Sequence, residues 1–183
     1  PTNKLWELFF QYPLYEGGAD KARIQPTFVS NHDNGRFGYF VRKAFPQASD
    51  EEQLKRVILA HAMLLTLRGV PTIYSGDEQG FAGDGWDQDS REDMFPSKTA
   101  VYNDNVLIGT KATTAQSNFD TAHPLYTKMA QLSGMRQRHA ALRRGKQIVR
   151  NYADTPGLFA VSRIDPDDGH EIVVAFNTSD KAM

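Results

Sequence analysis

A cluster of polar and ionisable side chains follows a short apolar run at residues 28–30. The cluster consists of Asn31, His32, Asp33 and, three positions later, Arg36. An ionised carboxylate is a strong acceptor for two adjacent hydroxyl groups, and an imidazole beside it can donate to a neighbouring oxygen. The positive charge of Arg36 could hold the Asp33 carboxyl in its ionised form. These residue types could therefore bind the hydroxyl groups of a ligand.

The same residues also fit a purely structural role. Asp33 would then cap a turn that leads into Gly35, and His32 would be a buried imidazole with satisfied hydrogen bonds. For an isolated Asn-His-Asp triplet this structural role is the commoner one. The choice between the two roles depends on the residues around the triplet.

The residues around the triplet predict a strand, a helix and a second strand. Residues 27–30 have the pattern of a buried strand, and 72–74 form a second short apolar run. Between them, Ser49 is a good N-cap with Glu52 as its capping-box partner, and Gly69 provides the stop signal of the helix. A strand, a helix and a strand at this spacing predict a βαβ unit with parallel strands.

The remaining sequence predicts less regular structure and then a small sheet. Residues 80–120 are polar and have no sustained hydrophobic period. A second long helix is expected over 122–143, with Thr121 as its candidate cap. A short helix is expected over 3–11, and 37–47 should form either a loop or a short helix. Three antiparallel strands are expected at 147–152, 158–164 and 171–176.

Three stretches together resemble the signatures of the alpha-amylase family, glycoside hydrolase family 13. Residues 31–33 resemble the Asn-His-Asp that closes the seventh strand of that family's barrel. Residues 69–80, GVPTIYSGDEQG, are similar to its eighth-strand signature Gly-x-Pro-x-x-Tyr-x-Gly-x-Glu, and 87–94 are similar to an acidic-Arg-Met stretch that follows in many members. The order and the spacing agree with the family, and the likeness covers at least 24–95.

The resemblance implies an α/β fold. Residues 1–145 would be the C-terminal portion of a (β/α)₈ catalytic barrel, and 146–183 would be the first antiparallel strands of a truncated C-terminal β domain. Both ends of the chain would then be cut. Because an incomplete barrel leaves a parallel strand edge exposed, we also expect the chain to self-associate.

The resemblance also implies roles for individual residues. Asp33 matches the carboxylate that stabilises the transition state in the −1 subsite, and His32 matches its substrate-binding partner there. Asn31 and Arg36 would also bind substrate. Glu78 would be a structural hydrogen-bonding residue at the barrel rim.

Three further candidates follow the second strand. Asp89 and Arg91 would line the acceptor side, although an ion pair between them that ties down the loop is an equal alternative. Trp86 could stack on a sugar ring, as could Phe37 and Tyr39, although for any one of them simple packing is the preferred interpretation.

The implied substrate is an α-glucan or a maltooligosaccharide. The family's nucleophile and general acid should precede the Asn-His-Asp, and neither motif occurs in the first 32 residues. We therefore expect the parent protein to be a retaining glycoside hydrolase and the 183-residue chain alone to be inactive. A non-catalytic carbohydrate-binding or regulatory fragment that retains part of the −1 subsite is the alternative.

Composition excludes several other classes of function. The net charge of −1 argues against nucleic-acid binding, and no apolar run reaches the length of a membrane span. The absence of cysteine excludes disulfides, thiol catalysis and thiolate metal sites. The acidic residues of 84–93 lack the spacing of a calcium loop, so no cofactor or metal is expected here, while calcium in a longer parent protein stays possible. The cellular compartment is left open.

Overall fold

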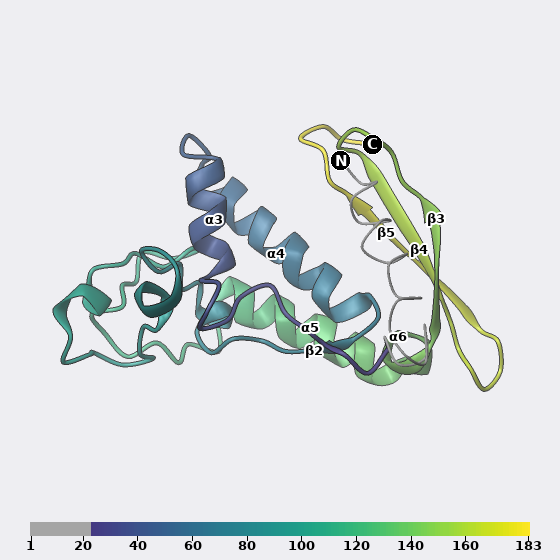
Figure 1. The fold of residues 1–183 in the computed structure, drawn as a ribbon, viewed down its shortest axis with the longest axis horizontal. Coiled ribbons are helices and arrows are strands. Elements are labelled where there is room, and N and C mark those ends of the chain that lie inside the picture. Colours follow the sequence, from purple (N-terminus) through teal and green to yellow (C-terminus); the bar gives the residue numbers. More distant parts are fainter. Residues whose placement is uncertain (1–22) are drawn as a thin grey trace. The chain divides into compact units, whose positions relative to one another are not determined.

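The computed structural model describes residues 23–183 (Figure 1). The predicted helix at 3–11 lies outside the described residues. The described chain divides into two compact units, each assembled from separate stretches of sequence. One, called here the sheet unit, contains 23–27, 63–71 and 133–183; the other, called the loop unit, contains 28–62 and 72–132. The predicted domain division at residue 145 stays a prediction.

Two short parallel strands in the sheet unit correspond to the predicted strand pair. β1 (Pro26–Thr27) pairs with β2 (Val70–Pro71), with Pro26 opposite Val70. The parallel pairing is confirmed, but both strands begin and end earlier in the sequence than predicted. The predicted burial at 28–30 is wrong for Phe28, whose exposed fraction is 46%. Within residues 23–183, β1 and β2 pair only with each other, so no neighbouring strand covers the apolar residue that follows β1.

The predicted long helix is α4 (Asp50–Thr66). Its first turn is capped as expected, because the Glu52 amide donates to Ser49 Oγ at 3.2 Å. Its stop signal is also confirmed, since Gly69 has φ of +114°, a conformation that a residue with a side chain adopts only under strain. Val57 and His61, which are four residues apart on one face of the helix, are buried.

The predicted second helix is two helices. α5 (Pro124–Arg138) and α6 (Ala140–Arg144) are separated at His139, whose extended backbone (φ −116°, ψ 110°) ends the hydrogen-bond ladder. At the start of α5, His123 Nδ1 accepts the amide of the residue two positions on at 3.2 Å, so His123 rather than Thr121 caps the helix. Proline at the first helical position removes an amide that would have no partner there.

The three predicted antiparallel strands are confirmed, with bounds that differ by at most one residue. They are β3 (Lys146–Asn151), β4 (Leu158–Ile164) and β5 (Glu171–Asn177), in the order β3-β4-β5. β4 is central and almost entirely buried. Phe159 and Phe176, which are paired across β4 and β5, stack with their ring centroids 6.2 Å apart.

Two arginines of the sheet unit bind the backbone at the C-terminal end of α4. Arg136 donates to the carbonyl oxygens of residues 65, 67 and 69 at 3.1, 3.3 and 2.7 Å. Arg163 is fully buried and donates to the carbonyls of Thr66 and Gly145 at 2.6 and 3.1 Å. Burial, with a further contribution from nearby arginines, lowers the pKa of Arg163 to about 10. Except for that of Gly145, which follows another helix, these carbonyls lie in or just after the last turn of α4, which leaves them unpaired.

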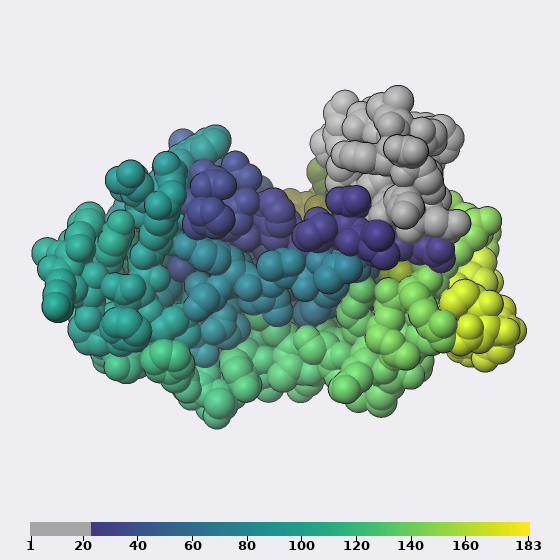
Figure 2. Space-filling model, turned by 60° about the horizontal axis from the view of Figure 1, so that its bottom comes forward, coloured from purple at the N-terminus to yellow at the C-terminus, as the bar shows by residue number. Residues whose placement is uncertain are grey.

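The loop unit contains α3 and the long polar segment. α3 (Phe37–Ala44) resolves the loop-or-helix alternative at 37–47 in favour of a helix. As expected, residues 80–120 hold no long regular element: their helical turns are η3 (Asp87–Ser90) and η4 (Ala100–Asn103), and η2 (Asp77–Gln79) precedes them. The segment nevertheless packs as a continuous body, teal in Figure 2. Its apolar residues Phe81, Ala82, Leu107 and Ile108 are buried.

In the part of the chain that the structure covers, none of the helices combines the length and the apolar character needed to cross a membrane.

Candidate functional site

The Asn-His-Asp triplet forms a tight turn at the start of the loop unit. The backbones of Asn31 and Gly35 exchange two hydrogen bonds, each 3.2 Å long. Asn31 Oδ1 also accepts the amides of Asp33 and Asn34 at 3.0 and 2.6 Å. The residue that caps the turn is therefore Asn31 rather than Asp33, and Gly35 closes it with φ of +89°.

The two side chains at the tip of this turn are open to solvent. The His32 and Asp33 side chains are 63% and 67% exposed, and His32 Nε2 lies 3.4 Å from Asp33 Oδ1. The alternative of a buried, structural His32 is thus wrong. A fixed backbone presents an imidazole and a carboxylate side by side, which is an arrangement suited to binding adjacent hydroxyl groups.

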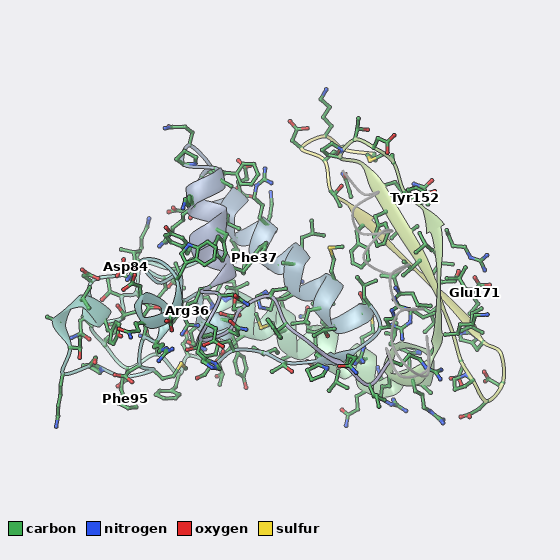
Figure 3. All side chains as sticks on the ribbon, viewed as in Figure 1. Arg36, Phe37, Asp84, Phe95, Tyr152 and Glu171 are labelled. Carbon is green, nitrogen blue, oxygen red and sulfur yellow. The ribbon has the colours of Figure 1, made fainter. Side chains whose placement is uncertain are left out.

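Arg36 points into the interior instead of toward Asp33. It is fully buried at the base of α3 (Figure 3). Its Nη1 donates to Asp77 Oδ1 at 3.1 Å, and its Nε lies 3.0 Å from Glu92 Oε2. The guanidinium also lies over the ring of Tyr74, 4.4 Å from the centroid. The expected pairing of Arg36 with Asp33 is therefore wrong, because two buried carboxylates pair with its charge. The expected direct contact of Arg36 with substrate is wrong as well, because its side chain is fully buried.

Close backbone approaches make this inward orientation possible. A Cβ at Gly35 would lie 2.8 Å from the carbonyl oxygen of Gly85, so only glycine lets these two segments meet. A Cβ at Gly76 would lie 3.2 Å from Arg36 Nη1 and 2.8 Å from the Phe81 ring. Glu78 Oε2 accepts the Gly76 amide at 3.0 Å, which is the structural role expected of that carboxylate.

Glu92 and Asp77 complete a charged cluster below the turn. Glu92 is 7% exposed. Burial raises its pKa to about 7, although the Arg36 charge opposes this, and the negative charge of Asp84 adds to the increase. Asp77 Oδ2 lies 3.4 Å from Nε2 of the buried His61. Sequence reasoning missed both carboxylates as partners of Arg36, although both lie inside the two family-like stretches at 69–80 and 87–94.

Arg91 connects the segment after η3 with the turn. Its Nε donates to the carbonyl oxygen of His32 at 3.3 Å, and its Nη2 lies 3.9 Å from Asp33 Oδ1. Its closer ion pair is with Asp87. The predicted pairing of Arg91 with Asp89 is therefore replaced by one with Asp87. Asp89 contributes through its backbone, whose amide donates to the Trp86 carbonyl at 3.1 Å.

Trp86 stands beside the turn with much of its ring in solvent. It is 57% exposed, and its ring meets Phe40 edge to face with the centroids 5.6 Å apart. Its Cα lies 3.5 Å from the position of a Cβ on Gly35. An indole anchored at one edge, with the rest exposed, is a surface on which a sugar ring can stack.

The arrangement as a whole offers hydrogen-bond donors, an acceptor and an aromatic surface, with fixed charges beneath them. Among residues 23–183, no group of three or more His, Cys, Asp or Glu side chains is placed to hold a metal ion. The expectation that this chain holds no cofactor stays a prediction, as does the possibility that a longer parent protein binds calcium.

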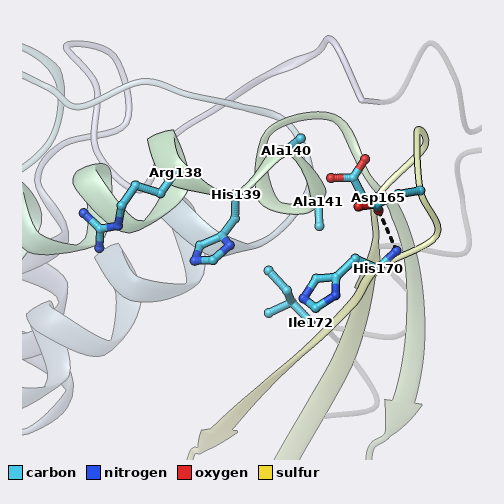
Figure 4. Close-up of a pocket in the computed structure, with 8 residues that line it drawn as sticks. Arg138, His139, Ala140, Ala141, Asp165, His170 and Ile172 are labelled. Carbon is cyan, nitrogen blue, oxygen red and sulfur yellow. Dashed lines mark hydrogen bonds between the residues drawn. The ribbon is translucent and has the colours of Figure 1, made fainter.

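A separate polar depression of about 200 Å³ lies in the sheet unit (Figure 4). It is lined by α6 and by the loop that joins β4 to β5, including His139, Asp165 and His170. It contains none of the residues that the sequence predicts for the site. Within this loop, the His170 amide donates to the Asp168 carboxylate at 2.8 Å.

The family model described as "Alpha amylase, catalytic domain" matches residues 15–145. The chain belongs to the alpha-amylase family. The resemblance inferred from the three sequence stretches is thereby confirmed.

Curated relatives of this amylase-family chain are much longer than it is. It is 45% identical over 167 residues to an alpha-amylase of Streptomyces lividans, a match that covers 90% of the chain and 18% of the relative. It is 29% identical over 158 residues to a beta/alpha-amylase of Paenibacillus polymyxa, covering 86% of the chain and 11% of the relative. The chain therefore spans less than a fifth of the length of these relatives.

Solved structures agree on the fold of this amylase-family chain. An alpha-amylase of Geobacillus thermoleovorans in complex with acarbose matches with a TM-score of 0.66 at 20% identity, covering 97% of this chain and 32% of that one. A gamma-cyclodextrin glucanotransferase of an alkalophilic Bacillus clarkii matches with a TM-score of 0.65 at 24% identity, covering 96% and 20%. At these identities the likeness concerns the fold alone.

Proposed function

We propose that this chain supplies part of the −1 sugar subsite of a retaining glycoside hydrolase or transferase that acts on α-glucans. The observation that carries the proposal is the exposed pair His32 and Asp33, fixed side by side on a turn that two backbone hydrogen bonds between Asn31 and Gly35 close. The names of the relatives agree with this substrate class, since they are amylases and cyclomaltodextrin glucanotransferases. Solved neighbours were crystallised with acarbose and with maltohexaose.

In this proposal Asp33 accepts hydrogen bonds from two adjacent hydroxyls of the bound sugar. Such bonds strengthen as the sugar gains oxocarbenium character, so the carboxylate stabilises the transition state more than the ground state. His32 donates to a neighbouring oxygen, and Arg91 holds both groups through the His32 carbonyl. Trp86 provides the stacking surface. Arg36 lies buried beneath the turn and does not touch the substrate.

We further propose that β1 and β2 are consecutive strands of the family's (β/α)₈ barrel, and that 146–183 begin its C-terminal β domain. Among the 183 residues, Asp33 is the single carboxylate that matches a member of the family's catalytic set. Without a nucleophile and a proton donor, the glycosidic bond cannot be attacked at the anomeric carbon or protonated at the leaving oxygen. The chain by itself is therefore proposed to bind α-glucans without cleaving them.

Calorimetric titration of the chain with maltoheptaose tests this function. Binding is expected, and Asp33→Ala should weaken it by about 10-fold or more, because hydrogen bonds to a charged group contribute about 1.5–3 kcal/mol. Asp154→Ala is the matched control, since it removes an exposed aspartate of the sheet unit. Equal affinity in both variants, or no heat at millimolar sugar, would reject the proposal.

Release of reducing sugar from maltodextrin gives a second readout. None is expected from the chain alone. Turnover that disappears in Asp33→Ala would instead show that the chain contains a catalytic pair that this assignment lacks.

Self-association is a further proposal about the isolated chain. Large apolar side chains of the sheet unit at the two short parallel strands are exposed, namely Ile24 (63%) and Val70 (49%). Surfaces of this kind ordinarily pair with another chain or with further parts of the same fold. Light scattering at increasing concentration should show a mass above that of the monomer, and a monomer throughout would reject the proposal.

A further inference from the structure

Four buried ionisable side chains form one connected group beneath the His32–Asp33 turn. We call Arg36, His61, Asp77 and Glu92 the buried charged cluster. Arg36 contacts both carboxylates, at 3.1 and 3.0 Å, and Asp77 is in turn 3.4 Å from His61. These residues come from four different segments of the loop unit. Arg36 is thus the point at which the turn is joined to the segments that carry Asp77 and Glu92.

Two short routes lead from the Arg36–Glu92 contact to the turn. Arg36 directly follows Gly35, which closes the turn by exchanging backbone hydrogen bonds with Asn31. Glu92 directly follows Arg91, which donates to the His32 carbonyl at 3.3 Å. Each member of the contact is therefore one residue away from a group that touches the turn. A change in the contact must act on the turn from both sides.

The charge on Glu92 decides how strongly this contact holds. When Glu92 is ionised, Arg36 faces two carboxylates in a site from which water is excluded; when Glu92 is protonated, Asp77 alone pairs with it. Burial raises the pKa of Glu92 to about 7, so both forms exist near neutrality. The other charged groups that act on Glu92 are Asp84, which favours protonation, and Arg42, which favours ionisation.

We propose that Arg36 and Glu92 are positioning residues for the His32–Asp33 turn, and that protonation of Glu92 loosens the hold of Arg36 on it. The turn should then have two arrangements, with the sugar-binding one favoured while Glu92 is ionised. That last consequence rests on the proposed function, whereas the coupling between Glu92 and the turn does not.

An NMR titration of the free chain from pH 5.5 to 8.5 tests the coupling without any ligand. The amide signals of Asp33, Asn34 and Gly35 should move with the same midpoint as the side-chain carboxyl carbon of Glu92. Glu92→Gln should abolish that movement, because glutamine cannot ionise. Glu51→Gln, which removes an exposed carboxylate of α4 in the same unit, should leave it unchanged.

Two results would overturn the proposal. A midpoint that persists in Glu92→Gln would belong to another group. Different midpoints for the turn amides and the Glu92 carboxyl carbon in the wild type would also overturn it. This second result needs no variant, so it decides the proposal even if Glu92→Gln does not fold.

The pH dependence of sugar binding provides a second test, which depends on the proposed function. The affinity of the wild type for maltoheptaose should be about fivefold higher at pH 8.5 than at pH 5.5, in the range of ordinary coupling between sites. In Glu92→Gln, measured in the same buffers, the ratio of the two affinities should be about one. If neither protein binds sugar at any pH, the proposed function fails, and the amide titration still decides the coupling. An equal pH ratio in both proteins would overturn the positioning role.

Discussion

Replacing Glu92 by glutamine should change how the stability of the chain depends on pH. The Glu92 carboxyl is buried beside Arg36, and its pKa rises from an ordinary 4.5 to about 7 in the folded chain. Because the folded state holds the proton more tightly than the unfolded state, protonation of Glu92 stabilises the fold. This contribution is fully present below pH 4.5 and is lost as the pH rises through about 7.

The size of the effect follows from the two pKa values. One pKa unit corresponds to about 1.4 kcal/mol, so the full contribution is about 3 kcal/mol, of which about 2 to 3 kcal/mol falls between pH 5 and 8.5. Glutamine has nearly the same shape and cannot ionise, so Glu92→Gln should lack this loss. Relative to the wild type, the variant should therefore gain about 2 to 3 kcal/mol in unfolding free energy over that interval.

Urea unfolding followed by far-UV circular dichroism at pH 5, 6, 7 and 8.5 measures this difference. Glu51→Gln provides the control, because Glu51 is an exposed carboxylate paired with Lys55 on the surface of α4. Its pH profile should follow that of the wild type. If Glu92→Gln and the wild type lose stability in parallel as the pH rises, Glu92 is not the buried acid described here and the account of the cluster is wrong.

Four further substitutions test the packing and the helix capping within the two units. Arg163→Met should lower the unfolding free energy by about 2–4 kcal/mol in urea, because two buried backbone carbonyls lose their donor; no loss would mean that water replaces the guanidinium. Gly80→Ala should lower the unfolding free energy by well over the roughly 1–2 kcal/mol that an alanine in the left-handed conformation costs, because its Cβ would overlap the Ile108 backbone. Gly169→Ala should cost that backbone strain alone, because Gly169 has φ of +75° and open space around it. Equal shifts of the thermal midpoint in the two variants would contradict this. Ser49→Ala should cost about 1 kcal/mol by thermal unfolding, as the loss of a helix cap does, and an unchanged midpoint would deny the cap its role.

Sequence alone determined the local elements whose signals lie within a few residues. The start of α4 was predictable because the Ser49 cap and its partner are three residues apart, and the antiparallel strands β3 to β5 because alternation and turn residues are local patterns. The family was also accessible, because three motifs in a fixed order are far more specific than any one of them. The break at His139 was not, since no glycine or proline marks it.

Tertiary structure decided which charged groups meet. Arg36 stands three residues from Asp33, and proximity in sequence suggested that they pair, yet its partners are Asp77 and Glu92, 41 and 56 positions away. Likewise Arg91 pairs with Asp87 and reaches back to the carbonyl of the Asn-His-Asp turn. A long side chain can leave the backbone in either direction, and the side that offers buried opposite charge is set by how distant segments pack. No pattern local to the turn carries that information.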